Sequence, residues 1–446
     1  RTERPQWSPA SSHRYQINSC LRIPTKGYRP FCHNEAMSTT AAALPYDRRL
    51  VGWLSLAQLV SWGSVFYGFS LLLEPVERDL GLTRAQTSLA FSLALMAEGL
   101  LAYPVGRWID RGHERIVMTG GSLLMAGCLL LHSFVTGMAA FYAVWIGLGA
   151  GLSATLYTPV FAVVTRRFPH DFRRAIITLT FLGGLASTVF IPLTDALITH
   201  LGWRHALWVL AAFHLLLCAP LHAVVLRGAP RQVAASSRGT PPAPLGHYLR
   251  SAPFLLIGLF VMLMMGVTAA LPAHMVSLLR DNGMSEFWVV AVPAAIGLIQ
   301  VLGRLLLYFF ERHFDLHLAN RLIPCLVPLG LAALLAAPLA GGGHGTAALL
   351  LVMLFVALYG IGNGMLTIVK GTAVAQYVNR EHVASLNGAL GVPQAIARAL
   401  APLALGLLWR PGVGYTYGLW LLLVASMVAV LALLLAQRRA LAGARA

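Results

Sequence analysis

The sequence has few charged residues and none of the common signatures of enzymes. Charged side chains make up 11% of the 446 residues, against roughly 25% in soluble proteins. The motifs Gly-x-x-x-x-Gly-Lys-Ser/Thr, His-Glu-x-x-His and Gly-x-Ser-x-Gly are all missing; they mark phosphate-binding loops, zinc proteases and serine hydrolases. These absences argue against a soluble domain, an ATP-driven pump and a hydrolase, so we expect no enzyme. The alternative from a different functional class is an intramembrane enzyme or sensor.

Metal, cofactor and nucleic-acid sites also lack support. The five cysteines are scattered singly, and no two histidines of the apolar runs are paired at the i, i+4 spacing of a helical metal site (His132, His214, His222 and His274). The formal net charge of +17 comes from arginines between apolar runs and not from a basic soluble domain. We therefore expect no metal, no cofactor and no nucleic-acid partner.

What the sequence does contain is long apolar runs. From Leu50 onward, twelve runs approach the roughly 20 residues that a helix needs to cross a bilayer. They lie at 51–73, 86–105, 115–135, 139–164, 174–198, 204–226, 252–279, 287–309, 319–339, 346–371, 383–408 and 413–436. A stretch rich in Gly, Pro, Ser and Arg at 227–250 separates the first six runs from the last six. The pattern predicts an all-α membrane protein with twelve transmembrane helices in two six-helix bundles, 50–226 and 251–436, followed by a cytoplasmic tail at 437–446.

Residues 1–49 are predicted to be a disordered N-terminal extension. Residues 1–36 are polar and basic, and they lack the apolar stretch of a secretory signal. Met37 is followed by Ser-Thr-Thr and resembles a natural start. On this interpretation the preceding residues are an artefact of the gene boundary, and the alternative is a disordered cytoplasmic tail.

The arginine positions predict the orientation in the membrane. With both termini on the cytoplasmic side, nineteen arginines of loops and ends fall on that side and five on the other: Arg78, Arg84, Arg204, Arg280 and Arg410. Cytoplasmic loops of membrane proteins carry the excess of Lys and Arg. We therefore expect a multi-pass protein of a bacterial inner (plasma) membrane, monomeric in the lipid bilayer, with both termini cytoplasmic.

Two repeated features indicate a duplicated transporter. A charged segment at 106–115 lies between two apolar runs, and a weaker copy begins at Gly303-Arg304 and ends at Glu311-Arg312. Such polar turns at the membrane surface could hold and release two half-bundles that rock about a central site. Three glycines of the fourth run also recur in the tenth at a constant offset, and they predict faces where helices approach closely: Gly147, Gly149 and Gly151, with Gly360, Gly362 and Gly364.

The chain from about 50 to 436 resembles a major facilitator superfamily transporter. Segment 106–115 is similar to the superfamily signature Gly-x-x-x-Asp-Arg-x-Gly-Arg-Arg: Gly106, Asp110 and Arg111 match, whereas the second glycine comes one place early and His113-Glu114 interrupts the basic pair. The resemblance implies that Asp110 caps a neighbouring helix near His382. Together with Arg115, these three matching residues would then form a cytoplasmic gate motif.

A narrower likeness covers Gly63 to Ser92, Gly183 to Ser187 and Gly202-Trp203-Arg204. These segments resemble bacterial members of the monocarboxylate transporter and oxalate/formate antiporter group. In those relatives an arginine of span eight meets the substrate carboxylate, and Arg304 occupies the similar position. Monocarboxylate carriers of animals place an aspartate four residues earlier, where this chain has Gln300. The chain thus lacks the aspartate of the aspartate–arginine pair on which proton coupling in those carriers would depend.

Charged residues inside the spans are candidate functional groups, because a charge at mid-bilayer costs at least about 2.5 kcal/mol. Glu98 lies roughly 12 Å from the turn at Gly106 by helical rise, which makes it a candidate protonatable gate; a structural carboxylate is the alternative. Arg304, Lys370 and Arg398 are predicted to form a positive cavity that binds substrate. For Arg304 and Lys370 the alternative is a side chain that reaches the inner membrane surface.

Uncharged polar residues complete the predicted binding site. Tyr67, Asn363 and Gln394 lie in runs that usually line the cavity of this fold, although hydrogen bonding between helices is the alternative. The second half contains three interior cations and the first half only one interior acid. We therefore expect a secondary transporter of a small organic anion, with a coupled proton or counter-anion. Efflux of a hydrophobic or toxic compound is the alternative.

Overall fold

The computed structural model describes residues 46–168, 171–228, 245–310, 316–340, 345–379 and 383–443. Within these ranges the chain is helical, and its only strand-like pairing is an isolated bridge between Arg410 and Gly414. The predicted extension with Met37, the linker residues 229–244, and the residues Glu311, Arg312 and His382 lie outside the described residues.

The first half of the described chain forms a bundle, here called the first bundle. Its elements are α1 (Arg48–Ser61), η1 (Trp62–Tyr67), α2 (Gly68–Leu80), α3 (Arg84–Trp108), η2 (Ile109–His113), α4 (Glu114–His132), α5 (Met138–Thr155), α6 (Tyr157–Arg167), α7 (Phe172–Gly184), α8 (Ala186–Leu201), α9 (Trp203–Ala212), η3 (Phe213–Cys218) and α10 (Ala219–Val225).

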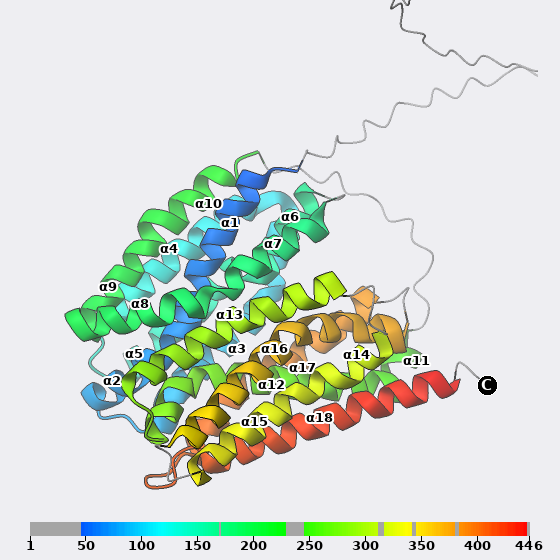
Figure 1. Cartoon of the computed structure of the whole chain (residues 1–446). Coiled ribbons are helices and arrows are strands. Elements are labelled where there is room, and N and C mark those ends of the chain that lie inside the picture. Colours follow the sequence, from blue (N-terminus) through cyan, green and yellow to red (C-terminus); the bar gives the residue numbers. More distant parts are fainter. Residues whose placement is uncertain are drawn as a thin grey trace, which may run out of the picture. The chain divides into compact units, whose positions relative to one another are not determined.

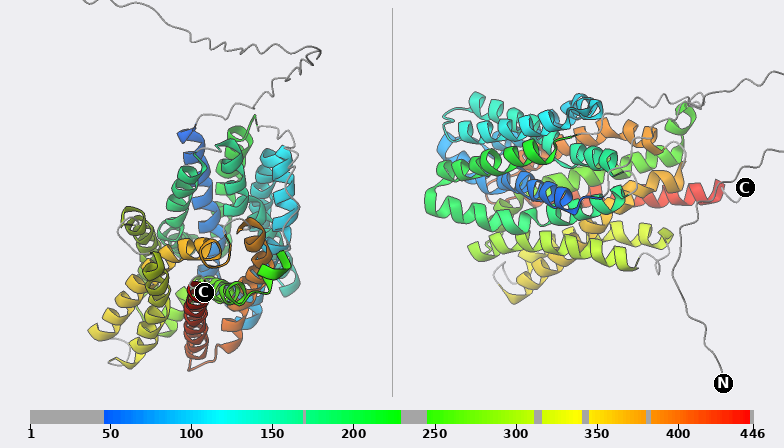
Figure 2. Two further views of the ribbon diagram at one scale, coloured as in Figure 1. Left: turned by 90° about the vertical axis from the view of Figure 1, so that its right-hand side faces the viewer. Right: turned by 90° about the horizontal axis from the view of Figure 1, so that it is seen from above.

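The second half forms a matching second bundle, preceded by the short helix α11 (Leu245–Leu249) at the end of the predicted linker. Its elements are α12 (Ala252–Asp281), α13 (Glu286–Phe310), α14 (Leu316–Leu322), η4 (Ile323–Cys325), α15 (Leu326–Ala336), η5 (Ala337–Leu339), α16 (Thr346–Tyr377), α17 (Val383–Leu408) and α18 (Thr416–Gly443). Figures 1 and 2 show the first bundle, blue to green, grouped on one side of the second, green to red.

The described helices account for twelve membrane crossings, as the sequence predicts. Eleven continuous helical segments are long and apolar enough to cross a bilayer, and one of them, Arg84–His132, has 49 residues. That segment contains both α3 and α4, which Gly112 separates with a φ of 88°. A positive φ is easily adopted only by glycine, so Gly112 allows two consecutive helices to share one tight turn. The all-α membrane fold is confirmed.

Local sequence signals place the helix ends. Thr83 and Gln86 form a capping box at the start of α3, in which the Gln86 amide donates to Thr83 Oγ1 and the Thr83 amide donates to Gln86 Oε1. Such reciprocal bonds satisfy amides that the first helical turn leaves without partners. Gly81 ends α2 in the left-handed conformation, with a φ of 65°. The turn at 81–83 and the turn at 109–113 therefore define the two ends of α3, here called the Gly81 end and the Gly112 end of the protein.

The two bundles meet along several pairs of helices. α3 packs against α17, α2 packs against α12, and α13 packs against α7 and α8, as Figure 1 shows for α13. Gly99 lies against Ala395, and Gly406 lies against Ser88 nearer the Gly81 end. At Gly106, Gly388 and Gly391, toward the Gly112 end, no atom lies within 4 Å of where a Cβ would stand. The glycine contacts between α3 and α17 therefore run from the Gly81 end to the middle of the molecule.

The repeated glycines allow close helix contacts, as predicted. A Cβ at Gly149 would overlap the backbone of Ala94 on α3, and a Cβ at Gly364 would overlap the backbone of Gln300 on α13. A Cβ at Gly360 would overlap the side chain of Ile299 on α13. Small residues let helix backbones approach where apolar burial in lipid gives little driving force.

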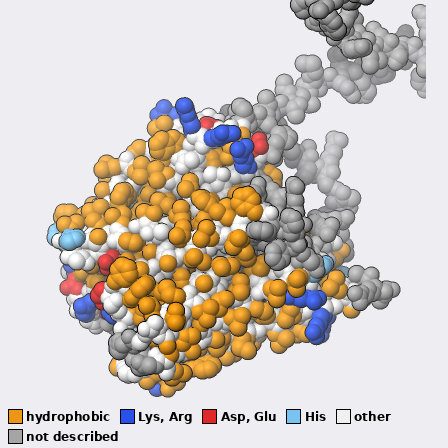
Figure 3. All heavy atoms as spheres, viewed as in Figure 1, with side chains coloured by type: hydrophobic (Ala, Val, Ile, Leu, Met, Phe, Trp, Pro, Cys, Tyr) orange, Lys and Arg blue, Asp and Glu red, His pale blue; other side chains and the backbone are white. Residues whose placement is uncertain are grey.

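The surface matches a lipid environment. Large apolar side chains are exposed on most helices, including Leu216 of η3 at 73% and Leu350 of α16 at 64%. Figure 3 shows hydrophobic side chains covering the visible face, with charged side chains gathered toward its edges. Exposed apolar surface of this extent would be unfavourable in water and is expected in a bilayer.

Candidate functional site

Arg304 lies at the contact between the two bundles. It comes from α13, and its Nη1 donates to the carbonyl oxygen of Thr180 on α7 at 2.5 Å. Gly184, one turn further along α7, makes room for it, because a Cβ there would stand 2.8 Å from the same nitrogen. Among the described residues, Arg304 Nε has no hydrogen-bond partner. The guanidinium thus lies between the bundles, and its Nε donor has no partner among the described residues.

Two tyrosines of the first bundle lie near this guanidinium. Tyr67, at the end of η1, and Tyr157, at the start of α6, both interact electrostatically with Arg304. Tyr67 also lies near Ser187 of α8. Tyr67, predicted from the sequence, is therefore close to Arg304, whereas Tyr157 and Ser187 were not predicted. No sequence motif distinguishes these two from other polar residues of the spans.

Lys370 is a partly buried cation with a weak partner. Its Nζ donates to the thioether of Met265 on α12 at 3.0 Å, and no carboxylate pairs with it among the described residues. A thioether is a poor acceptor for an ammonium group. Arg304 and Arg398 are its charged neighbours, so the three predicted cations lie in one electrostatic environment.

Arg398 pairs with Glu98, the charged residue predicted inside the first half of the chain. The guanidinium of Arg398 on α17 binds both carboxylate oxygens of Glu98 on α3, at 3.1 and 3.3 Å. The two side chains are 20% and 12% exposed. The structure therefore joins the candidate proton carrier and a candidate substrate ligand in one ion pair between the bundles.

The remaining predicted ligands are half-buried on the same helices as the cations. Asn363 lies on α16 two turns before Lys370, and Gln394 lies on α17 one turn before Arg398. Residues at these helical spacings share a face. Asn363 and Gln394 make no side-chain hydrogen bond within the described part of the chain. Their roles as ligands stay predictions, as do those of Arg304, Lys370 and Tyr67.

The charged hairpin at the Gly112 end places its predicted gate residues on the surface. Asp110, Arg111 and Arg115 are exposed, and Gly106 is partly buried. Arg115 Nε donates to the carbonyl oxygen of Ala223 on α10 at 2.7 Å, which ties the hairpin to its own bundle. The predicted contact of Asp110 falls on His382, outside the described residues. The gate role of this motif stays a prediction.

Glu114 is the buried carboxylate of this hairpin, and the sequence interpretation missed it. It has no exposed surface and pairs with Arg167 at 2.6 Å and Arg166 at 3.3 Å, both on α6. Arg167 also donates to Leu226 O at 3.0 Å. Against the family signature, Glu114 is only an interruption of the basic pair. Its burial depends on how α4 and α6 meet, which the local sequence does not show.

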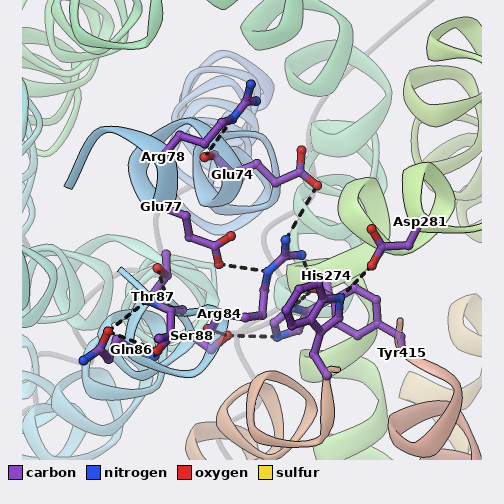
Figure 4. Close-up of polar contacts among 12 residues, drawn as sticks. Glu74, Glu77, Arg78, Arg84, Gln86, Thr87, Ser88, His274, Asp281 and Tyr415 are labelled. Carbon is purple, nitrogen blue, oxygen red and sulfur yellow. Dashed lines mark hydrogen bonds and ion pairs between the residues drawn. The ribbon is translucent and has the colours of Figure 1, made fainter. Parts of the chain in front are cut away.

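A second polar cluster joins the bundles at the Gly81 end. Arg84, at the start of α3, forms an ion pair with Glu77 of α2 at 2.9 Å and donates to the Tyr415 hydroxyl of the second bundle at 2.6 Å. Its guanidinium carbon also lies 4.8 Å from the ring centre of Trp409, a distance typical of cation–π contacts. Figure 4 shows Arg84 between Glu77 and Tyr415.

Further contacts extend this cluster on both sides. Arg280 of α12 forms an ion pair with Glu74 of α2 and another with Glu286 of α13 at 2.8 Å. Trp409 Nε1 donates to Asp281 at 2.7 Å. From the sequence, Arg84 and Arg280 are only loop charges, because their partners are distant in the chain.

No group of three or more His, Cys, Asp or Glu side chains in the described ranges is arranged to hold a metal ion.

Comparisons with known proteins place this geometry in a family. Residues 54–358 match the Major Facilitator Superfamily. Monocarboxylate transporter 13 of Bos taurus is 33% identical over 209 residues, covering 45% of this chain and 47% of the relative. Monocarboxylate transporter 12-B of Danio rerio is 28% identical over 239 residues, covering 46% and 50%. The chain thus spans about half the length of the curated relatives it matches.

Solved structures share the fold. A bacterial homolog of the human lysosomal transporter Spinster, in an inward-facing and unoccupied conformation, has a TM-score of 0.66 at 17% identity, covering 88% of this chain and 97% of that one. The nucleoside transporter NupG has a TM-score of 0.66 at 16% identity, covering 87% and 98%. At such identities the likeness establishes the arrangement of helices alone.

Proposed function

Because the chain belongs to the major facilitator superfamily, we propose that it is a secondary active transporter that moves a small organic anion across a membrane by alternating access. In this mechanism two bundles rock about a central site that opens to one side of the membrane at a time. The helical spans and the polar contacts between the bundles support this proposal.

The observation that carries the anion proposal is the environment of Arg304. Its guanidinium lies between the bundles, with Nε lacking a partner among the described residues and with two tyrosines nearby. A carboxylate accepts paired, charge-assisted hydrogen bonds from a planar guanidinium. An anion would also offset the cost of holding this charge away from water.

The balance of charge supports the same conclusion. Glu98 neutralises Arg398, which leaves Arg304 and Lys370 without a carboxylate partner in the described residues. The names of the relatives, monocarboxylate transporters, agree with a monocarboxylate-like substrate. We assign Arg304 and Lys370 as the main anion ligands, with Tyr67, Asn363 and Gln394 beside them.

Glu98 is the proposed coupling residue of the central site. A proton on Glu98 would cancel its charge and release Arg398 from the ion pair. The released guanidinium could then bind the substrate anion, so proton and anion would enter together. A counter-anion at the same cations is the other way in which the site could be coupled.

In the proposed orientation, the Gly112 end lies on the cytoplasmic side of a bacterial inner membrane. The arginines of the Gly112 end outnumber those of the Gly81 end, which agrees with the charge rule for membrane proteins. With the Gly81 end joined by the Arg84 cluster, this arrangement corresponds to a transporter closed toward the outside.

Transport by purified protein in proteoliposomes tests the proposal. Short monocarboxylates, dicarboxylates, nucleosides and organic cations are offered with and without a pH gradient. We expect uptake of an anion, and Arg304→Lys should raise its KM by about tenfold, because charge is kept but the two-pronged hydrogen bonding is lost. Arg321→Lys is the matched control, since Arg321 binds Gln437 within the second bundle.

Two outcomes would overturn the proposal. One is a substrate that proves to be a cation, and the other is normal binding and transport of the identified anion by Arg304→Ala. Resistance assays in an expressing strain test the alternative, efflux of a hydrophobic or toxic compound.

A further inference from the structure

His274 is a buried histidine at the contact between the two bundles. It lies on α12 with no exposed surface. Its Nε2 is 2.9 Å from the carbonyl oxygen of Pro402 on α17, and its Nδ1 is 3.0 Å from the hydroxyl of Tyr415. Ser88 of α3, in the first bundle, approaches Nε2 at 3.5 Å. Figure 4 shows His274 beside Arg84 and Tyr415.

The partners determine the direction of each hydrogen bond. A carbonyl oxygen can only accept, so Nε2 of His274 carries the proton and donates to Pro402. In this neutral ring Nδ1 is an acceptor, and the Tyr415 hydroxyl donates to it. The Tyr415 oxygen in turn accepts from Arg84 of the first bundle. One directed chain therefore runs from Arg84 through Tyr415 to His274 and Pro402.

A second proton on His274 is incompatible with this chain. Nδ1 would become a donor, so the Tyr415 oxygen would face two donors, Arg84 and His274, and its own proton would lose His274 as acceptor. The imidazolium would also stand beside the Arg84 guanidinium, which binds the same Tyr415 oxygen.

The charged residues of the cluster that contains Arg84 come from four helices. α2 contributes Glu74 and Glu77, and α3 contributes Arg84; α12 contributes Arg280 and Asp281, and α13 contributes Glu286. The carboxylates outnumber the guanidinium groups by four to two in these contacts. A hydrated imidazolium would therefore be well accommodated here once the bundles separate and water enters.

We propose that His274 is a proton-binding site that controls the contact between the two bundles at the Gly81 end. The neutral ring completes the closed contact, and the protonated ring favours separation of the bundles. The proposal relies on the proposed function only in that the bundles alternate between two arrangements, and it is independent of the substrate.

The sign of the pH effect follows from proton linkage. The closed form binds fewer protons at His274 than the open form, so lowering the pH favours opening. The effect begins near pH 6.5, about the ordinary pKa of a hydrated histidine. One linked proton changes the ratio of open to closed protein by at most about tenfold per pH unit.

Distances between two spin labels measure this ratio directly. The labels are placed at Arg78→Cys on α2 and Ser285→Cys before α13, both exposed at the Gly81 end of different bundles, in a chain whose five native cysteines are replaced. We expect the longer-distance population to rise as the pH falls from 7.5 to 5. Substrate is left out, so an incorrect assignment of the substrate would not affect the result.

Two variants separate His274 from other titratable groups. His274→Asn keeps an acceptor for Tyr415 but cannot take up a proton, and it should remove the pH dependence while leaving the closed distance. Tyr415→Phe keeps the aromatic ring beside Arg84 and breaks the chain, so it should open the Gly81 end at neutral pH. His132→Asn is the matched control, because His132 is equally buried but contacts aromatic rings of the first bundle.

The proposal is overturned if the wild-type distances do not change with pH, or if His274→Asn retains the wild-type pH response. Closed distances for Tyr415→Phe at every pH would also overturn it. Should His274→Asn fold poorly, His274→Gln, which also offers an acceptor and takes up no proton, is measured in its place.

Discussion

The ion pair between Glu98 and Arg398 offers a quantitative test of how the bundles are held together. Two hydrogen bonds at 3.1 and 3.3 Å connect α3 to α17, and the side chains are 12% and 20% exposed. Glu98→Gln removes the negative charge while keeping nearly the same shape. The Arg398 guanidinium would then lie between the bundles without a counter-charge.

The size of the effect follows from the burial of the pair. Two unit charges 4 Å apart interact by about 4 kcal/mol at an effective dielectric constant of 20, and breaking a fully buried pair costs about 3 to 5 kcal/mol. Because water reaches part of both side chains, we expect Glu98→Gln to lower stability by about 2 kcal/mol. Arg398→Gln should have a similar effect, while the double variant should lose little more than either single one.

Thermal unfolding of the wild type and the three variants in one detergent measures this coupling. The double variant removes both charges, so neither partner remains buried alone, and its midpoint should lie close to those of the single variants. If the two single losses add in the double variant, the pair contributes no coupling. The assignment of Glu98 and Arg398 as a stabilising contact between bundles would then be refuted.

Three further predictions concern other parts of the fold. Glu114→Gln should lower the unfolding midpoint by the equivalent of about 3 kcal/mol, because it leaves Arg166 and Arg167 without their fully buried carboxylate; an unchanged midpoint would contradict this. Asp110→Asn, on the exposed part of the same hairpin, should leave the midpoint unchanged but slow transport, and a wild-type rate would exclude its gate role. Gly364→Ala should destabilise by about 1 to 3 kcal/mol through overlap with the Gln300 backbone, whereas Gly371→Ala on the same helix, with no neighbour within 4 Å, should not.

The number and nature of the helices could be predicted from the sequence because hydrophobicity acts locally. A run of about 20 apolar residues commits a segment to the bilayer whatever its neighbours are. The glycine repeats were also informative, since a missing side chain has the same consequence wherever two helices touch. Gly149 and Gly364 do lie against neighbouring backbones.

Partners between helices could not be predicted in this way. Glu98 and Arg398 are 300 residues apart, and Arg84 and Tyr415 are 331 apart, so no spacing rule connects them. The sequence identified Glu98 and Arg398 as separate candidates because a charge inside a span is costly by itself. It gave no reason to single out His274 or Glu114 as functional, because nothing in the local pattern shows which helix faces them.

The amino-acid sequence by itself determined that this chain crosses a membrane with twelve helices and which few charges lie inside them, because burial in lipid depends on each segment alone. Only the tertiary structure decided which of those charges are neutralised. Glu98 pairs with Arg398, whereas Lys370 has only the Met265 thioether. The strength of an ion pair or hydrogen bond depends on a few ångströms of separation, and these distances exist only after the two bundles have packed.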